Sequence, residues 1–177
     1  MNTLVAATLR LEAQVASHAR DMFEVLCDPA IYEFENQPPQ SLDWLEDRFR
    51  KLESRLSSDG SEQWLNWVIR LPSGALAGFI QATVLPGPNA YVAYELASRF
   101  WRQGIGSTAL TAVIRELGAT YGVHNCLAVF KARNFRSQAL LRSLDFTGVS
   151  PAGLASVACE PDELVMYKRV SDGKNAV

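Results

Sequence analysis

Hydrophobic and polar positions in the first third of the chain follow two different periods. Residues 3–11 alternate loosely and include β-branched side chains, which predicts a first strand. Residues 12–27 present one apolar face at helical spacing. We expect this helix to end before Pro29, because the residue before a proline avoids the α region. Ser41 is a suitable N-cap for a second helix. The apolar stripe of that helix consists of Leu42, Leu45, Phe49, Leu52 and Leu56.

After residue 61 the pattern becomes that of strands and then returns to that of helices. Strands at 64–70 and 75–84 flank the turn Pro72-Ser73-Gly74, which predicts a hairpin, and a third strand follows at 91–97. A long helix that stops at Gly122 is indicated by the apolar residues Ala109, Val113, Ile114, Leu117 and Tyr121. The last predicted elements are a strand at 126–130, a helix at 135–144 and strands at 146–149 and 164–169.

This order of elements is typical of an α/β sandwich with a mixed sheet. A chain of 177 residues, 48% of them hydrophobic, is expected to form one domain over residues 1–177. Its formal net charge of −2 argues against a protein held on nucleic acid by a basic face. The longest uncharged stretch, residues 71–94, is interrupted by prolines and glycines. We therefore interpret it as strands and turns rather than a membrane span.

Cysteine and histidine do not occur at the spacing of a metal site. The three cysteines lie far apart, and with only His18 and His124 they form no zinc pattern. We therefore expect no metal, a reducing compartment and a buried Cys126. Both histidines are predicted to lie at the surface. The N-terminus lacks the basic and apolar segments of a signal peptide, which predicts a cytoplasmic protein.

The segment with the clearest chemical signal is Arg102-Gln103-Gly104-Ile105-Gly106-Ser107, between a strand and the long helix. Its two glycines let the backbone turn tightly and approach a ligand closely. The start of a helix offers unpaired N–H groups and the positive end of the helix dipole, which together favour a pyrophosphate. Arg102 adds a cation. Taken alone, the segment is equally consistent with a glycine turn that only begins a helix.

The same glycines match the dinucleotide-binding fingerprint, with Ala109 in its last position. Three observations disfavour that alternative. Residues 98–103 separate the first glycine from the strand, residues 121–133 contain no acidic side chain to hold a ribose, and three antiparallel-looking strands precede the motif.

The residues around this loop resemble those of the GNAT superfamily of N-acetyltransferases. The similar segments are strand 91–97, Arg102-Gln103-Gly104-Ile105-Gly106, strand 127–130, Asn134-Phe135-Arg136-Ser137, and residues 140–146. The Asn-x-x-Ser pattern, together with TLRLEA at 8–13 and SGALAGFIQ at 73–81, is most similar to the RimJ/RimL-like branch. The resemblance is close over residues 75–146 and looser over the whole chain.

The resemblance implies a central, mostly antiparallel sheet with a splayed parallel strand pair and helices on both faces. It also implies acetyl-CoA as co-substrate, with the pantetheine arm in the gap between the splayed strands. Backbone groups of Leu96 and Ala97 would bind that arm, and an N–H near Leu96 would stabilise the oxyanion. Asn134 and Ser137 would also contact it, although Asn134 is equally a suitable helix N-cap. The pyrophosphate would be bound by Arg102, Gln103, Gly104, Ile105, Gly106 and Ser107.

The chain departs from the family at two positions. Many members have a tyrosine that protonates the leaving thiolate where this chain has Leu141, and Ser137 is the natural substitute. Asp145 replaces the usual glycine before the last aromatic residue, so we expect a different turn geometry there.

A carboxylate is expected to take the proton of the acceptor ammonium before the amine attacks. Glu95 is our first choice, because it lies within a strand and strand alternation places it opposite Tyr94 and Leu96. The other candidates lie in loops or before the last strand: Glu33, Glu35, Glu160, Asp162 and Glu163. Strand aromatics either line an acceptor pocket or pack in the core, and these are Trp64, Trp67, Tyr91 and Tyr94.

The predicted function is N-acetyl transfer from acetyl-CoA to a primary amine by direct attack in a ternary complex. The acceptor would be a protein N-terminus or a small amine, with no nucleic acid or membrane partner. The alternative is a non-catalytic acyl-CoA-binding or sensing domain of the same fold. The resemblance implies a homodimer. The loops at 31–40 and 150–163 carry no motif that identifies the acceptor.

Overall fold

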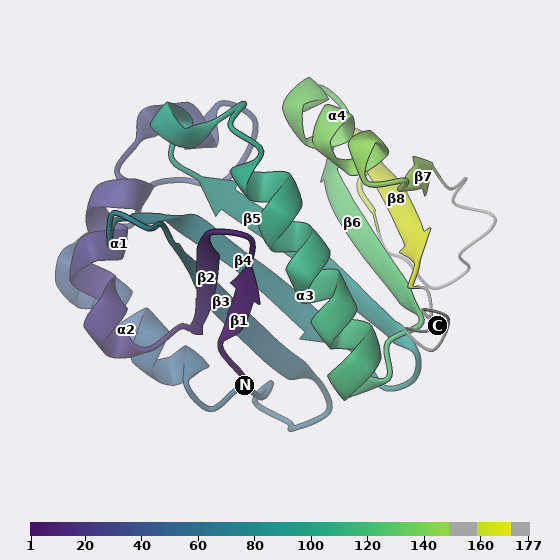
Figure 1. Ribbon diagram of the computed structural model, residues 1–177, viewed down its shortest axis with the longest axis horizontal. Helices are drawn as coiled ribbons and strands as arrows, with labels where there is room; N and C mark the ends of the chain where they lie inside the picture. The colour runs from purple at the N-terminus through teal and green to yellow at the C-terminus, as the bar shows by residue number, and fades with distance from the viewer. Residues whose placement is uncertain (149–158, 171–177) are drawn as a thin grey trace.

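The computed structural model describes residues 1–148 and 159–170 and forms one eight-stranded sheet with helices on both faces (Figure 1). The strands are β1 (Leu4–Ala6), β2 (Leu9–Ala13), β3 (Gln63–Arg70), β4 (Leu76–Val84), β5 (Asn89–Leu96), β6 (Asn125–Lys131), β7 (Thr147–Gly148) and β8 (Glu163–Arg169). The helices are α1 (Ala19–Leu26), α2 (Leu42–Leu52), α3 (Ile105–Tyr121) and α4 (Phe135–Ser143), with 3₁₀ turns η1 (Ala16–His18), η2 (Pro29–Tyr32) and η3 (Ser98–Phe100).

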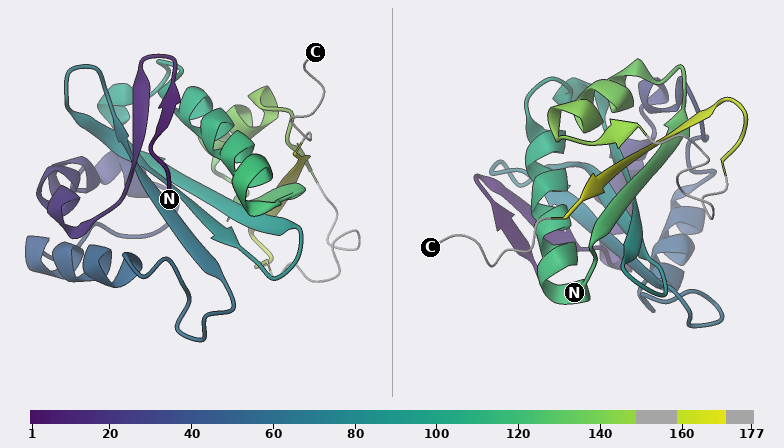
Figure 2. Two further views of the ribbon diagram at one scale, coloured as in Figure 1. Left: turned by 60° about the horizontal axis from the view of Figure 1, so that its bottom comes forward. Right: turned by 90° about the vertical axis from the view of Figure 1, so that its right-hand side faces the viewer.

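The sheet order is β1-β2-β3-β4-β5-β6-β8-β7, and every neighbouring pair is antiparallel except β5–β6. Helices α3 and α4 pack on one face over the larger core, whereas α1 and α2 cover the other face over a smaller core (Figure 2). This confirms the expected mixed sheet with helices on both faces.

Two predictions for the N-terminal region are wrong. Residues 3–11 form a hairpin of two short strands, β1 and β2, which turns at Ala7 with a φ of 51°. The helix expected from residue 12 begins only at Ala19. Glu12 instead lies in β2, opposite Val68 of β3, where its carboxylate accepts from Arg70 Nε at 2.9 Å. Pairing with β3, which is distant in the sequence, therefore outweighs the local helical spacing.

The expected start of α2 and end of α3 are confirmed, but α2 ends at Leu52, so Leu56 of the expected apolar stripe lies outside the helix and is exposed. Ser41 Oγ accepts from the N–H of Trp44 at the start of α2, and Gly122 ends α3 with a φ of 65°. The turn at Asp145 has a φ of 60°, the left-handed conformation that glycine favours, so the different geometry expected there is not found. The strand expected at 146–149 is present as β7, but its last residue, like residues 150–158 of the expected acceptor loop, lies outside the described residues.

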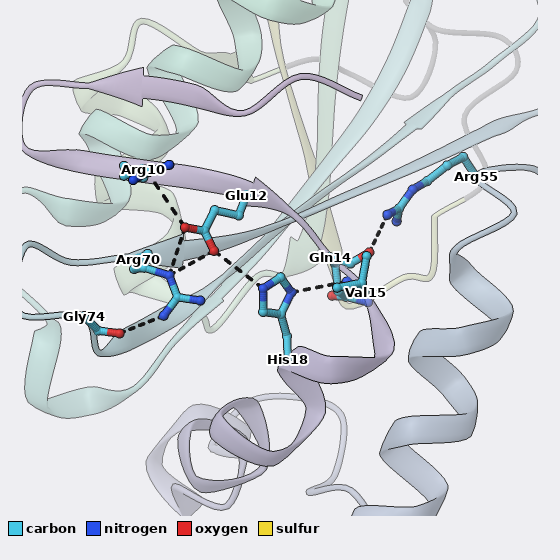
Figure 3. Close-up of polar contacts among 8 residues, drawn as sticks. All are labelled: Arg10, Glu12, Gln14, Val15, His18, Arg55, Arg70 and Gly74. Atoms are coloured by element: carbon cyan, nitrogen blue, oxygen red, sulfur yellow. Dashed lines mark hydrogen bonds and ion pairs between the residues drawn. The ribbon is translucent and has the colours of Figure 1, made fainter.

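His18 is not the surface residue that we expected, because its side chain is only 14% exposed. Its Nδ1 accepts from the N–H of Val15, and its Nε2 lies 3.5 Å from Glu12 (Figure 3). Burial lowers the pKa of His18 and the nearby Glu12 opposes this, and the ring joins the end of β2 to the start of α1. His124 is exposed and Cys126 is buried, as predicted.

Strands β5 and β6 pair only at their first residues. The parallel register joins Asn89 to Asn125 and Tyr91 to Leu127, and beyond this the two strands diverge (Figure 1). From there β5 pairs only with β4, and β6 pairs only with β8. The expected splayed pair is therefore present, and it opens a gap beside the N-terminus of α3.

Candidate active site

A large cavity of about 1010 Å³ lies at the splayed ends of β5 and β6. On one side it is lined by the loop before α3 and by the first turns of α4. On the other side it is lined by the segment after α1 and by α2. The two sides meet at Tyr94, Glu95 and Leu96 of β5. One cavity therefore joins most of the predicted cofactor residues to the predicted acceptor region. The exceptions are Ala97 and Gln103, which do not line it; the side-chain Nε2 of Gln103 donates to the carbonyl of Arg99 at 2.8 Å.

The edge of β5 that faces the gap carries backbone groups directed away from β4. The N–H of Ala97 donates to the carbonyl of Ala77 at 3.0 Å, and the β4–β5 register pairs Gly78 with Leu96. Hydrogen-bonded pairs alternate along an antiparallel ladder, so the N–H groups of Tyr94 and Leu96 point toward the gap. Both residues lie beyond the part of β5 that pairs with β6.

Leu96 and Ala97 differ in what they offer a ligand. The Leu96 carbonyl accepts from Trp101 Nε1 at 2.8 Å, whereas its N–H faces the open part of the gap. The carbonyl of Ala97 accepts from the N–H of Phe100, and the N–H of Ala97 donates to the carbonyl of Ala77 in β4. Of these two residues, Leu96 therefore has a backbone N–H directed at the gap, whereas both backbone groups of Ala97 are already bonded.

The loop at 102–107 forms the N-terminus of α3. Gly104 is its N-cap, with a φ of 75°, and Arg102 also adopts a positive φ of 61°. The first N–H that bonds back within the helix is that of Thr108, to the carbonyl of Gly104, so the N–H groups of the first turn have no intrahelical acceptor. A Cβ on Gly106 would lie 3.4 Å from Leu140 of α4, so glycine here also allows α3 to pack closely on α4.

The start of α4 contributes a polar pair that faces β5. Asn134 caps the helix, because its Oδ1 accepts from the N–H of Ser137 at 3.0 Å. The Ser137 hydroxyl lies 2.7 Å from the hydroxyl of Tyr94, which reaches across from β5. Burial raises the pKa of Tyr94 to about 12, so its phenol stays protonated. Asn134, Ser137 and Tyr94 all line the cavity.

Glu95 lies on the opposite face of β5, toward α1 and α2. Its Oε1 accepts from Asn36 Nδ2 at 3.4 Å, and burial is the main reason that its pKa rises to about 7. The nearby Glu35 also raises this pKa, and the Asn36 hydrogen bond opposes the rise. A Cβ on Gly78 would lie 2.0 Å from the Glu95 carbonyl, so β4 can approach β5 this closely only with glycine there.

Among the other carboxylates proposed as bases, Glu35 also lines the cavity, and burial raises its pKa. Glu33 is paired with Arg136 at 2.5 Å. The remaining three, Glu160, Asp162 and Glu163, surround Lys131 Nζ at 2.7, 3.0 and 3.2 Å. None of those four is among the described residues that line the cavity. Of the carboxylates considered as general base, only Glu95 and Glu35 therefore line the cavity.

A cluster centred on Arg136 connects the segment after α1 to α4 at the edge of the cavity. Its guanidinium lies 4.6 Å from the ring centroid of Trp101, 5.0 Å from Phe135 and 5.4 Å from Phe34. Phe34 and Phe135 also pack edge to face at 5.9 Å. This cluster could not be predicted from the sequence, because Phe34 and Trp101 are brought to Phe135 and Arg136 only by the fold.

The strand aromatics divide between core and cavity. Trp67 is fully buried in the core, whereas Tyr94 lines the cavity. Leu141, at the position of the family tyrosine, is fully buried as well. Within residues 1–148 and 159–170, no three His, Cys, Asp or Glu side chains come close enough to hold a metal ion. No helix in these residues is both long and apolar enough to cross a membrane.

Solved structures with this arrangement include several acetyltransferases. The RimL ribosomal L7/L12 alpha-N-protein acetyltransferase in complex with CoA has a TM-score of 0.77 and 18% identity, over 97% of this chain and 99% of that chain. The ribosomal-protein-S5-alanine acetyltransferase from Vibrio fischeri has a TM-score of 0.77 and 16% identity, over 98% and 100%. A spermidine N-acetyltransferase chimera from Vibrio cholerae and hSSAT has a TM-score of 0.74 and 17% identity, over 96% and 100%.

The sequence identities to these solved structures are low, so the structural similarity shows a shared fold alone. A search of curated proteins found no matching sequence. The sequence profile of the acetyltransferase (GNAT) domain, however, matches residues 8–147, which include β2 to β6, the loop before α3 and all of α4. The chain therefore belongs to the GNAT acetyltransferase family.

Proposed function

We propose that this protein transfers the acetyl group of acetyl-CoA to a primary amine, by direct attack in a ternary complex. The observation that carries this proposal is the continuity of the cavity. It extends from the N-terminus of α3, suited to a pyrophosphate, to Glu95, whose pKa of about 7 suits a general base.

The residues on the α3 side fit the cofactor. Gly104 and Gly106 leave the first turn of α3 accessible to phosphate oxygens, and Arg102 adds a positive charge nearby. The free edge of β5 at Leu96 suits an amide of the pantetheine arm, which would lie along the gap as an added strand. In this arrangement the Leu96 N–H also lies where it can stabilise the negative charge that develops on the thioester oxygen.

In the proposed reaction, Glu95 acts from one face of β5, and Ser137 with Tyr94 acts from the other. Glu95 takes a proton from the acceptor ammonium, directly or through water, and the free amine attacks the thioester carbonyl. As the tetrahedral intermediate collapses, the nitrogen loses its second proton to water, the carbon–sulfur bond breaks, and the thiolate departs toward α4. There the Ser137 hydroxyl, held by Tyr94, donates a hydrogen bond to the leaving sulfur.

Ser137→Ala is expected to lower kcat about tenfold, since a hydrogen bond to a charged group contributes roughly 1.5 kcal/mol. Tyr94→Phe should have a smaller effect, because Tyr94 is a positioning residue that acts through Ser137. Steady-state kinetics with acetyl-CoA measure both changes, and calorimetry measures the Kd of CoA. A loss confined to kcat supports the role, whereas an equal loss of CoA affinity contradicts it.

One observation favours the alternative of a non-catalytic acyl-CoA-binding domain: the position of the family tyrosine is occupied by the buried Leu141. The decisive experiment incubates the protein with acetyl-CoA and a panel of peptide N-termini, polyamines and aminoglycosides. Thiol release and acetylated products are then measured. Amine-dependent release above hydrolysis supports the enzyme, and CoA binding without release supports the alternative.

A further inference from the structure

Three amide side chains form one row across the sheet on the face that carries Glu95. The N–H of Gln14, just after β2, donates to the carbonyl of Asn66 in β3 at 2.9 Å. The registers then place Asn66 opposite Gln81 of β4, and Gln81 opposite Ala93 of β5. Glu95 lies two residues beyond Ala93 on the same face. The row therefore leads from the proposed base toward the far edge of the sheet.

All three amides line the same large cavity as Glu95. The opposite wall of this part of the cavity is formed by Arg48, Phe49 and Leu52 of α2. Gln14 and Asn66 are each only 2% exposed, and they are the buried polar residues of the part of the chain that the structure describes. Amide side chains on a buried sheet face are costly unless they are hydrogen-bonded.

Gln14 has one polar atom without a partner. Its main chain is fully bonded, because its N–H donates to Asn66 and its carbonyl accepts from Arg55 (Figure 3). Its side-chain Nε2 is buried and has no hydrogen-bond partner among the described residues. The contact between His18 and the N–H of Val15 fixes the next residue, so Gln14 is held where it is. The unpaired donor therefore belongs to a residue whose main chain is held by hydrogen bonds and which lines the cavity.

We propose that Gln14, Asn66 and Gln81 form a subsite for the acceptor, in which Gln14 donates to a carbonyl oxygen far from the reacting amine. This inference rests on the proposed function, because it assigns the amine end of the acceptor to Glu95. From β5 to β2 there are three strand spacings, or roughly 14 Å. An extended peptide of about four residues spans that distance at roughly 3.5 Å per residue.

The chemistry of the row favours a peptide over a polyamine. Amide side chains both donate and accept, and they carry no charge, so they match the alternating carbonyl and N–H groups of a main chain. A polyamine would instead require carboxylates along the same path. The subsite is therefore selective for an N-terminal peptide segment whose carbonyl groups cross β4 and β3.

Gln14→Leu tests this subsite, because leucine has a similar size but no hydrogen-bonding group. The acceptors compared are the tetrapeptide amide Ser-Ala-Ala-Ala-NH₂, spermidine and butylamine. We expect the KM of the peptide to rise about tenfold, the effect of one lost hydrogen bond. The values for spermidine and butylamine should not change. The melting temperature should stay the same or rise, because the substitution removes a buried unpaired donor.

Gln81→Leu provides a second variant that is less buried, and it should raise the KM of the peptide in the same selective way. Gln63→Leu is the matched control, since Gln63 is an exposed glutamine on β3 outside the cavity. An unchanged KM for the peptide in Gln14→Leu and Gln81→Leu overturns the proposal. Equal losses for the peptide and butylamine, or a marked fall in melting temperature, show a structural role and overturn it as well.

Different results would contradict the proposed function and the proposed subsite. If acetyl-CoA gives no product with any amine, the proposed function is wrong. The subsite is then tested by calorimetric binding of the same peptide amide to the wild-type and Gln14→Leu proteins with CoA present. If butylamine is acetylated but Gln14→Leu does not change the KM of the peptide, the proposed function is correct and the subsite is wrong.

Discussion

Glu95→Gln is expected to lower kcat/KM by roughly 10²- to 10⁴-fold, the usual contribution of a general base. Glutamine keeps the shape of the side chain and its hydrogen bond with Asn36, but it cannot take a proton from the acceptor. Acetyl-CoA binding should not change, because Glu95 faces α1 and α2 rather than α3. Initial rates with a reactive amine, together with the Kd of CoA, measure the two effects.

The pH profile gives the same prediction an independent test. The carboxylate is the active form of the base, and the pKa of Glu95 is raised to about 7, mainly by burial. In the wild-type protein kcat/KM should therefore rise with pH through about 7 and then level off. An acceptor amine of low pKa keeps its own titration out of this range. In Glu95→Gln the rise should disappear.

Glu35→Gln is the matched control, because Glu35 is the other candidate carboxylate that lines the cavity. Its pKa is also raised, mainly by burial and further by the charge of Glu163, but Glu35 lies in the segment after α1 rather than on β5. We expect a small change in rate. If Glu35→Gln removes activity and Glu95→Gln does not, the base is wrongly assigned.

Gly104→Val is expected to weaken CoA binding by roughly 100-fold, through the loss of one or two charge-assisted hydrogen bonds to phosphate. Valine strains a residue with a φ of 75° and places a branched side chain at the N-terminus of α3, where phosphate oxygens would approach. Calorimetry with CoA measures the loss.

Gly60→Val separates strain from loss of the ligand site. Gly60 has a φ of 73° in an exposed turn, and a Cβ there would meet nothing within 4 Å, so the two substitutions carry a similar conformational cost. Gly60→Val should lower the melting temperature but leave CoA affinity unchanged. An unchanged Kd in Gly104→Val would show that this loop does not bind the pyrophosphate.

Local features of the fold could be predicted because their causes lie within a few residues. Ser41 caps α2 with its own hydroxyl, Gly122 ends α3 with a positive φ, and Asp28-Pro29 follows the last turn of α1. The glycines before α3 were recognisable for the same reason. Side-chain alternation within β5 was enough to place Glu95 opposite Tyr94.

The errors occurred where distant segments compete with local spacing. Residues 12 and 13 belong to β2 because Glu12 and Ala13 pair with β3, more than fifty residues away. The 43-residue separation of Tyr94 and Ser137 likewise carried no local sign of their hydrogen bond. From the sequence alone Tyr94 is consistent with the core or with a pocket, and only the tertiary structure brings its hydroxyl to Ser137 of α4.

The sequence by itself determined the element order from α2 onward, the family, the glycine turn of the loop before α3 and the face on which Glu95 lies. These depend on periodicity, capping and backbone conformation, which act within a few residues. Only the tertiary structure decided where β5 and β6 separate, which carboxylates reach the cavity, and that Gln14, Asn66 and Gln81 form one row. Those features depend on strand register and burial, and both are set by packing between segments that are far apart in the chain.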